Sequence, residues 1–363
     1  MKKKLTKVLA ATLVAVTALT GCGSAGSENA SGATSNVKIG MVTDMGSIDD
    51  RSFNQLTWEG IQKAGKDFGV KSKYLKPTGT TEPELMKELG NLYDGGFNFI
   101  VGSGYKFATP MYEAQTKYPN AKFVITDSTI YSASGDVKVA DNSVAVVFKG
   151  QEAGFLAGVA AAVQLKEANA GFIGGMESDV IQSFNWGYQQ GIAYANENLG
   201  TNIKVEDKNF IYQGTFTDSA AGQQLAAQMY DRGVDVIFSA AGGVGAGVIK
   251  EARERAAAGQ KVWVIGVDAD QYNDGIYEGQ NSVVLTSALK NVGVAVYDTI
   301  KLDVEGNFPG GQTLEYGLAN NGVGLPSENP NLSEETINAI NTVYEKVQNG
   351  EIKISATGEG LIA

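Results

Sequence analysis

From residue 37 onward, short apolar runs alternate with longer segments of helical periodicity. Most of the apolar runs are continuous stretches of Val, Ile and Phe, which are typical of strands buried on both faces of a sheet. The expected strands are residues 37–43, 97–102, 122–126, 144–148, 170–174, 234–239, 261–267 and 282–289, and the expected helices are 52–68, 82–93, 151–165, 181–198, 219–232, 244–258 and 333–348. This alternation predicts an α/β fold with doubly wound parallel sheets.

A single sheet would need more strands than is comfortable, and 363 residues correspond to about two domains at roughly 150 residues each. We therefore expect two doubly wound lobes joined by a hinge, with a ligand cleft between them. The first boundary falls near residues 148 and 149, where a strand is followed at once by a helix. We assign residues 37–148 and about 272–305 to the N-terminal lobe, and 149–271 and about 306–363 to the C-terminal lobe, although the pattern leaves residues after about 305 open to either lobe.

The helix after this boundary, GQEAGFLAGVAAAVQL (150–165), has the Gly and Ala spacing of membrane helix-packing motifs. It falls short of the about 20 apolar residues that a membrane span needs. We expect a buried helix that packs closely on a sheet.

The N-terminus has the pattern of an export signal. A basic start is followed by an uncharged apolar run (8–20) that is too short to cross a bilayer, for which about 20 residues are needed. The run ends in Leu-Thr-Gly-Cys, which resembles the lipobox of bacterial lipoproteins. The resemblance implies a signal peptide (1–21), a lipid-modified Cys22 and a flexible linker (22–36) that anchors the protein to the cell membrane, facing the extracytoplasmic side. An ordinary signal peptide with a coincidental cysteine is the alternative.

Composition excludes several classes of chemistry. The chain has no His and one Cys, so it contains no Ser-His-Asp or Cys-His machinery, no His-ligated metal and no intramolecular disulfide. Its formal net charge of −11 would repel nucleic acid, whose non-specific affinity comes from Lys and Arg. We expect no cofactor, no metal site and no nucleic-acid partner.

The loop between the first strand and the first helix (43–54) lies where such sheets bind ligands. Phe53 could stack on a flat ligand, and the amide of Asn54 could supply both a donor and an acceptor. Helix capping by Asp49, Asp50 and Ser52 explains part of the same polarity. A calcium loop would need a denser set of acidic residues.

Other polar residues follow later strands. Asp127 closes the strand 122–126, where it either caps the next segment or reaches into the cleft. The turn SAAGGVGAG (239–247) with Asp268 partly imitates a dinucleotide-binding fingerprint, but its glycine register fails. A glycine-lined turn remains, facing a carboxylate suited to a vicinal diol, or else a turn that serves close packing. Lys290 ends the strand 282–289 and could neutralise Asp268, bind ligand oxygens or simply be solvated.

These residues carry a resemblance to a known family. The segments VKIGMVTDMGSIDDRSFNQLTWEG (37–60), FVITDS (123–128), AGFIGG (170–175) with FNWGY (184–188), AAGGVGAG (240–247) and VIGVDAD (264–270), and then the strand ending in Lys290, are similar in order to the basic membrane protein family of substrate-binding lipoproteins. The resemblance implies a fold like that of the type I periplasmic binding proteins, and a monomer that is not an enzyme. It further implies delivery of purine nucleosides, such as guanosine, adenosine and inosine, to the permease of an ABC importer.

The same resemblance assigns roles in a nucleoside pocket. Phe53 and Phe184 would sandwich the base, with Trp186 and Tyr188 as further aromatic residues in the second segment. The remaining roles are base recognition by Asn54 and Asp127, ribose binding by Asp268 and Lys290, and pocket lining by Asp44 and Gly242. A nucleotide would find little to bind its phosphate besides Lys290.

Other functions remain open at this point. A nucleoside hydrolase could use Asp44, Asp49 and Asp50 to bind a metal and orient water. A sensor could present the same ligand to a signalling partner. A sugar or a signalling molecule could replace the nucleoside, because fold does not decide function.

Overall fold

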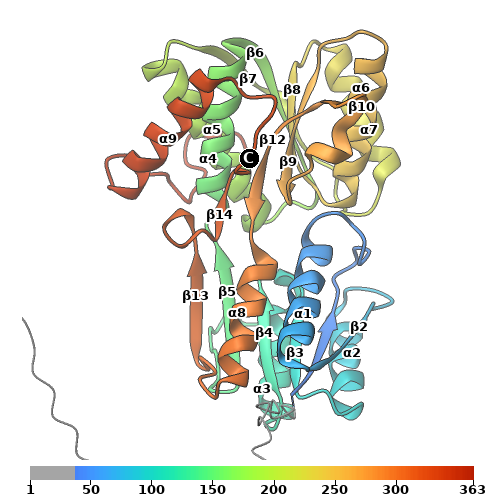
Figure 1. The fold of residues 1–363 in the computed structure, drawn as a ribbon. Coiled ribbons are helices and arrows are strands. Elements are labelled where there is room, and N and C mark those ends of the chain that lie inside the picture. Colours follow the sequence, from blue (N-terminus) through green and yellow to red (C-terminus); the bar gives the residue numbers. More distant parts are fainter. Residues whose placement is uncertain (1–36) are drawn as a thin grey trace, which may run out of the picture. The chain divides into compact units, whose positions relative to one another are not determined.

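A computed structural model describes residues 37–363. The expected signal peptide (1–21), Cys22 and the linker (22–36) lie outside the described residues. The described part forms two six-stranded sheets and a small two-stranded ribbon, β10 (Ile276–Glu278) and β11 (Asn281–Ser282). We call each large sheet with its covering helices a lobe (Figure 1).

The sheet of the first lobe is entirely parallel, in the order β13-β5-β4-β3-β1-β2. Its strands are β1 (Lys38–Val42), β2 (Lys71–Leu75), β3 (Phe99–Gly102), β4 (Lys122–Thr126), β5 (Ser143–Phe148) and β13 (Gln312–Tyr316). Successive side chains point to opposite faces, so Ile39 and Met41 pack with α1 (Phe53–Phe68) and α8 (Val292–Val304). Val42 and Ile100 pack instead with α2 (Glu82–Asp94) and α3 (Ala108–Lys117).

The sheet of the second lobe has the order β14-β12-β9-β8-β6-β7, and only β14 in it is antiparallel. Its strands are β6 (Glu167–Gly174), β7 (Asn202–Tyr212), β8 (Val236–Ala240), β9 (Trp263–Asp268), β12 (Val284–Lys290) and β14 (Val323–Gly324). One core contains α4 (Gly150–Leu165), α5 (Asp179–Asn198) and α9 (Glu334–Gln348), and the other contains α6 (Ser219–Asp231) and α7 (Gly243–Ala257). Short 3-10 turns, η1 (Tyr105–Phe107), η2 (Tyr272–Gly275) and η3 (Leu318–Asn320), complete the described elements. The predicted α/β fold with two parallel, doubly wound sheets is confirmed.

Two of the expected lobe boundaries are wrong. β12 pairs with β9 of the second sheet, so residues 272–290 do not join the first lobe, whereas α8 after it packs on α1. β13 pairs with β5, so residues 312–316 belong to the first sheet and not to the C-terminal lobe. An apolar run shows that a strand forms but not which sheet it joins, because strand pairing depends on contacts far away in sequence.

The connections between the lobes are bonded to one another. The chain passes from β5 to α4, from β12 to α8, and from β13 toward β14. The Lys149 amide donates to the Tyr316 carbonyl at 2.9 Å, and the Asn291 amide donates to the Gly322 carbonyl at 2.9 Å. The crossing segments are therefore tied to one another by backbone hydrogen bonds at the boundary between the lobes.

The helix α4 is buried along nearly its whole length, as predicted from its Gly and Ala content. A Cβ added at Gly154 would lie 2.3 Å from the Phe184 carbonyl oxygen of α5. Only glycine therefore permits this approach of the two helices. The contact fixes α5, the helix that carries Phe184. No helix among residues 37–363 has both the length and the apolar character required to cross a membrane.

Candidate functional site

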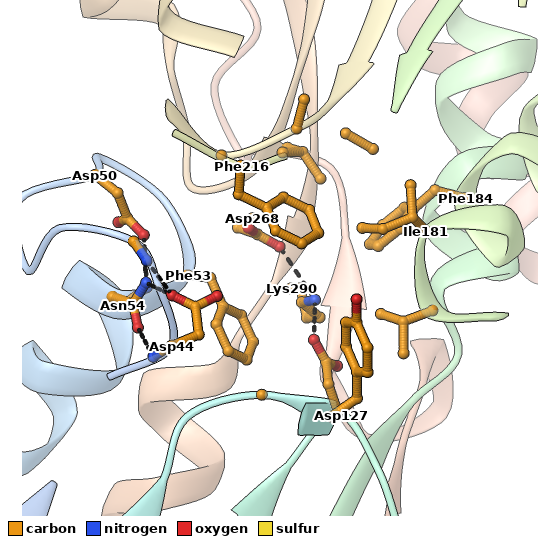
Figure 2. Close-up of a pocket in the computed structure, with 18 residues that line it drawn as sticks. Asp44, Asp50, Phe53, Asn54, Asp127, Ile181, Phe184, Phe216, Asp268 and Lys290 are labelled. Atoms are coloured by element: carbon orange, nitrogen blue, oxygen red, sulfur yellow. Dashed lines mark hydrogen bonds and ion pairs between the residues drawn. The ribbon is translucent and has the colours of Figure 1, made fainter. Parts of the chain in front are cut away.

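A pocket between the lobes collects side chains from the carboxyl ends of both sheets, the usual place for ligands in such folds (Figure 2). It encloses about 570 Å³ of free space, part of it open to solvent. Pockets of roughly 300–1,000 Å³ bind small molecules. The eight ligand-binding residues expected from the sequence all line it: Asp44, Phe53, Asn54, Asp127, Phe184, Gly242, Asp268 and Lys290.

Lys290 is buried at the centre of the pocket, with only 3% of the residue exposed. Its Nζ lies 2.6 Å from Oδ2 of Asp127 and 3.4 Å from Oδ1 of Asp268. Burial by itself lowers the pKa of Lys290, but the two carboxylates outweigh it and raise that pKa above its ordinary value. The ammonium therefore stays charged, and a solvated surface role for this residue is excluded.

Asp127 and Asp268 occupy equivalent positions, each at the carboxyl end of a parallel strand in its own lobe. Both have left-handed backbone, with φ of 62° and 63°. This conformation is uncommon outside glycine but is tolerated by Asp, and it turns the chain sharply at the cleft edge. The sequence left open whether Asp127 caps the next segment or reaches into the cleft, and in the structure its side chain reaches into the cleft. Burial raises its pKa, Lys290 acts against that shift, and Asp268 and Asp44 add to it.

The two oxygens of Asp268 have different surroundings. Oδ2 accepts a hydrogen bond from the Ser52 hydroxyl of the first lobe. Oδ1 is buried and has no hydrogen-bond partner among the described residues, although Lys290 Nζ lies within ion-pair distance. A carboxylate oxygen has two lone pairs, so Oδ1 retains the capacity to accept a further hydrogen bond beside this ion pair.

The loop before α1 is organised by Asp50. Its Oδ1 accepts the amides of Ser52 and Gln55, and its Oδ2 accepts the amide of Asn54 at 3.0 Å. Asp50 thus caps the helix, as expected for part of this loop. The expectation that Ser52 also caps it is wrong, since the Ser52 hydroxyl makes no cap bond and binds Asp268 instead. Asp49 accepts from the hydroxyl of Ser47 in the same loop.

The amide of Asn54 holds two of the pocket carboxylates. Nδ2 donates to Asp44 Oδ1 at 2.7 Å and to Asp50 Oδ2 at 2.9 Å, and Oδ1 accepts the Asp44 amide at 3.4 Å. Asp44 Oδ1 also accepts the Gly46 amide at 2.6 Å. Burial raises the pKa of Asp44 despite these bonds, and it raises that of Asp50 as well. In this structure both ends of the Asn54 amide bind the loop.

Aromatic rings stand on both sides of the buried cation. Lys290 Nζ lies 4.6 Å from the ring centroid of Phe53 and 5.4 Å from that of Phe184. Both distances are within the range of cation–π attraction. Of the three aromatic residues near position 184, Phe184 lines the pocket. Tyr188 packs on Phe238 in the core, and the Trp186 ring lies next to Gly358.

Sequence reasoning missed two aromatic residues of the pocket, Tyr105 and Phe216. Tyr105 follows β3 and Phe216 follows β7. Both positions are loops at carboxyl ends of parallel strands, the signal that identified Asp127 and Lys290. The first half of strand β7 has no apolar run to mark it, because most of it is exposed and polar. The sequence around Phe216 therefore gives little sign that this residue follows a strand.

The charges of the pocket restrict its ligand. Four carboxylates, those of Asp44, Asp50, Asp127 and Asp268, line it with the single ammonium of Lys290. A phosphate would meet uncompensated negative charge, whereas neutral hydroxyls and amides would find acceptors. Within residues 37–363 no three His, Cys, Asp or Glu side chains are arranged to hold a metal ion.

Comparison with known proteins decides the family. The model of the family described as "ABC transporter substrate-binding protein PnrA-like" matches residues 37–358. The chain belongs to this family. Its description is that of substrate-binding proteins of ABC transporters.

Relatives match the PnrA-like chain over nearly its whole length. It is 35% identical to a CD4+ T-cell-stimulating antigen of Listeria innocua, covering 97% of this chain and 99% of the relative. It is also 35% identical to the ABC transporter nucleoside-binding protein BmpA of Lactococcus lactis, covering 98% and 99%. A solute-binding protein of an ABC transporter from Aeropyrum pernix has a similar structure, with a TM-score of 0.77, 26% identity, and coverage of 88% of this chain and 94% of that one.

Proposed function

We propose that this PnrA-like protein is an extracytoplasmic lipoprotein that binds purine nucleosides between its lobes and delivers them to a membrane permease. The observation that carries the proposal is the buried Oδ1 of Asp268, which has no hydrogen-bond partner among the described residues beyond its 3.4 Å ion pair with Lys290, in a pocket that also contains aromatic rings. A nucleoside has ribose hydroxyls that can donate to Asp268 Oδ1, and a flat base that can stack on the aromatic rings. The name of the Lactococcus lactis relative supports the same ligand class.

The base is placed between Phe53 and Phe184. Stacking on aromatic rings binds any purine, because every base has a π-face. Asp127 supplies an acceptor beside this space, and Asn54 fixes the loop from which Phe53 projects. Because the two rings come from different lobes, the complete base site forms only when the lobes meet.

The ribose is placed at Asp268 and Lys290, with Asp44 and Gly242 lining the remaining wall. Asp268 Oδ1 accepts from one hydroxyl, and the Lys290 ammonium donates to a second oxygen. Gly242 has a φ of 54°, a backbone conformation that favours glycine, so this position of the pocket wall carries no side chain. The absence of a cationic cluster among the lining residues disfavours nucleotides.

Transport follows from hinged closure. An open cleft binds the nucleoside on one lobe, the other lobe closes over it, and the permease recognises the closed form. Ligand shifts this equilibrium only by its preference for the closed form, so the ligand must contact both lobes. The lipid on Cys22 and the linker (22–36) keep the protein at the membrane surface, where the permease is.

The experiment that tests the ligand class is equilibrium dialysis of the full chain with labelled guanosine, followed by competition. Unlabelled adenosine and inosine should displace the label, while ribose and adenine should displace it poorly because each fills half of the pocket. Displacement by arabinose or galactose instead of nucleosides would overturn the nucleoside assignment in favour of a sugar. No binding of guanosine would also contradict it.

A further inference from the structure

A short turn of the first lobe contacts one segment of the second lobe at three points. Arg51 Nη1 lies 2.5 Å from Asp274 Oδ1, and Gln271 Nε2 donates to the Arg51 carbonyl at 3.3 Å. Next to them, the Ser52 hydroxyl donates to Asp268 Oδ2 at 2.5 Å. All three contacts cross from the loop before α1 to residues 268–274, at the edge of the ligand pocket.

The Ser52 hydroxyl has no local role in its own helix. It makes no cap bond, because Asp50 accepts the amides of the first turn of α1. Ser52 is nevertheless fully buried. Its bond to Asp268 therefore exists only while the lobes are together, and it leaves the other oxygen of that carboxylate, Oδ1, facing the pocket.

Both sides of this contact are held in place before they meet. Arg51 has a left-handed φ of 55°, a conformation that a non-glycine residue adopts only where its surroundings require it. On the other side, Gln271 Oε1 accepts the Val267 amide and the Gln271 amide donates to the Ser287 hydroxyl. The side-chain amide of Gln271 is thus fixed to its own lobe by its oxygen, and its Nε2 points to the Arg51 carbonyl.

We propose that Arg51 and Ser52 form an interlobe clasp that positions Asp268 and sets the lifetime of the closed complex. Ser52 is a positioning residue, because it acts on the ligand through Asp268. This inference rests on the proposed nucleoside function only where it names the ligand. The contacts between the lobes do not depend on which ligand binds.

The kinetic consequence is specific. Contacts made only after closure slow dissociation and have little effect on association. Loss of a hydrogen bond to a charged group is expected to raise the dissociation rate at least about tenfold. Ser52→Ala should therefore release guanosine about tenfold faster with an association rate within about threefold of wild type, as measured by stopped-flow fluorescence on the full chain. Ser52→Thr keeps the hydroxyl and should restore most of the lifetime.

The controls separate the clasp from general damage. Ser47→Ala removes a hydroxyl from the same loop that bonds only Asp49 within that loop, and should leave both rates unchanged. Arg51→Ala removes a side chain that is 65% exposed, so it cannot disturb folding through the core. Its ion pair is worth little at the surface, so dissociation should rise only about two- to fivefold.

A second readout does not need a ligand. Fluorophores on Lys73→Cys in β2 and Lys250→Cys in α7, in a Cys22→Ser background, report the separation of the lobes in the full chain. Ser52→Ala and Arg51→Ala should populate longer separations than the parent.

The two failures can be told apart. If wild type binds guanosine and Ser52→Ala dissociates at the parent rate, the clasp is overturned and the nucleoside function stands. If wild type binds no nucleoside, the proposed function fails and the label distances alone decide the clasp: longer separations in the variants support it, and identical distributions overturn it.

Discussion

Lys290 Nζ lies 2.6 Å from Asp127 Oδ2 across the boundary between the two lobes. Lys290 ends β12 of the second sheet, and Asp127 follows β4 of the first. Both residues are almost fully buried. Taking two charges out of water is expensive, and only close pairing offsets that cost. Closure of the lobes therefore completes the electrostatics of the site as well as its shape.

Removing the cation should destabilise the closed protein. Lys290→Met leaves Asp127 and Asp268 facing each other without a counter-charge, so the free energy of unfolding at neutral pH should fall by about 3–5 kcal/mol. Urea denaturation measures it. Lys301→Met breaks an exposed pair with Glu305 in α8 and should cost less than about 1 kcal/mol. Equal, small losses in both variants would mean that Lys290 is not a buried counter-ion.

Stacking predicts the effect of Phe53. Phe53→Ala should weaken nucleoside binding by about 1–3 kcal/mol, the usual worth of an aromatic platform under a base. Phe53→Leu keeps most of the apolar volume and removes the π-face, so it should recover only part of the loss. Titration calorimetry with guanosine gives both values. Unchanged affinity in the alanine variant would place the base elsewhere.

Asp268 should distinguish ribosides from free bases. Asp268→Asn removes the charge at Oδ1 with little change of shape, so binding of adenosine should weaken much more than binding of adenine. Competition dialysis with both ligands compares them. An equal loss for the two would move Asp268 away from the sugar.

The raised pKa of Asp127 predicts a pH dependence of stability. In the unfolded state the pKa of Asp127 is near its ordinary value of 3.8, and in the folded state it is higher. Between these two pKa values the folded protein keeps the Asp127 proton, whereas the unfolded chain has released it. The wild-type free energy of unfolding, relative to Asp127→Asn, should therefore increase as pH falls from the raised pKa toward 3.8. Urea titrations of both proteins across the acid range measure the difference. A difference that stays flat or shrinks would contradict the raised pKa.

The lipid anchor has its own test. Cys22→Ser removes the thiol that would carry the lipid, so the protein should leave the membrane fraction for the aqueous fraction of cells that express it. Immunoblotting of the two fractions reports the result. A variant that stays with the membrane would show that Cys22 is not the anchor.

The sequence identified most of the fold because its signals were local. Residues 122–126 form an apolar run with a clear end, and β4 has the same bounds. Helix α1 begins one residue later than expected, at Phe53, because Ser52 occupies the N-cap position with a non-helical backbone (φ −150°, ψ −130°). β2 was missed because it is an exposed edge strand of the sequence KSKYL, with no apolar run to mark it.

The parts of the site that could not be predicted are its pairings. Asp127 and Lys290 were recognised individually because each follows a strand, but their ion pair joins two sheets whose membership depends on long-range contacts. The bond between Ser52 and Asp268 is hidden for the same reason. Ser52 has the sequence position of a helix cap, and only the meeting of the lobes shows its partner.

The central claim is that a purine nucleoside binds between Phe53 and Phe184 with its ribose on Asp268. A crystal structure of the protein grown with guanosine tests it most directly. We expect the base between the two rings and a ribose hydroxyl within hydrogen-bond distance of Asp268 Oδ1. Guanosine bound outside this pocket, or in the pocket with its ribose away from Asp268, would contradict it.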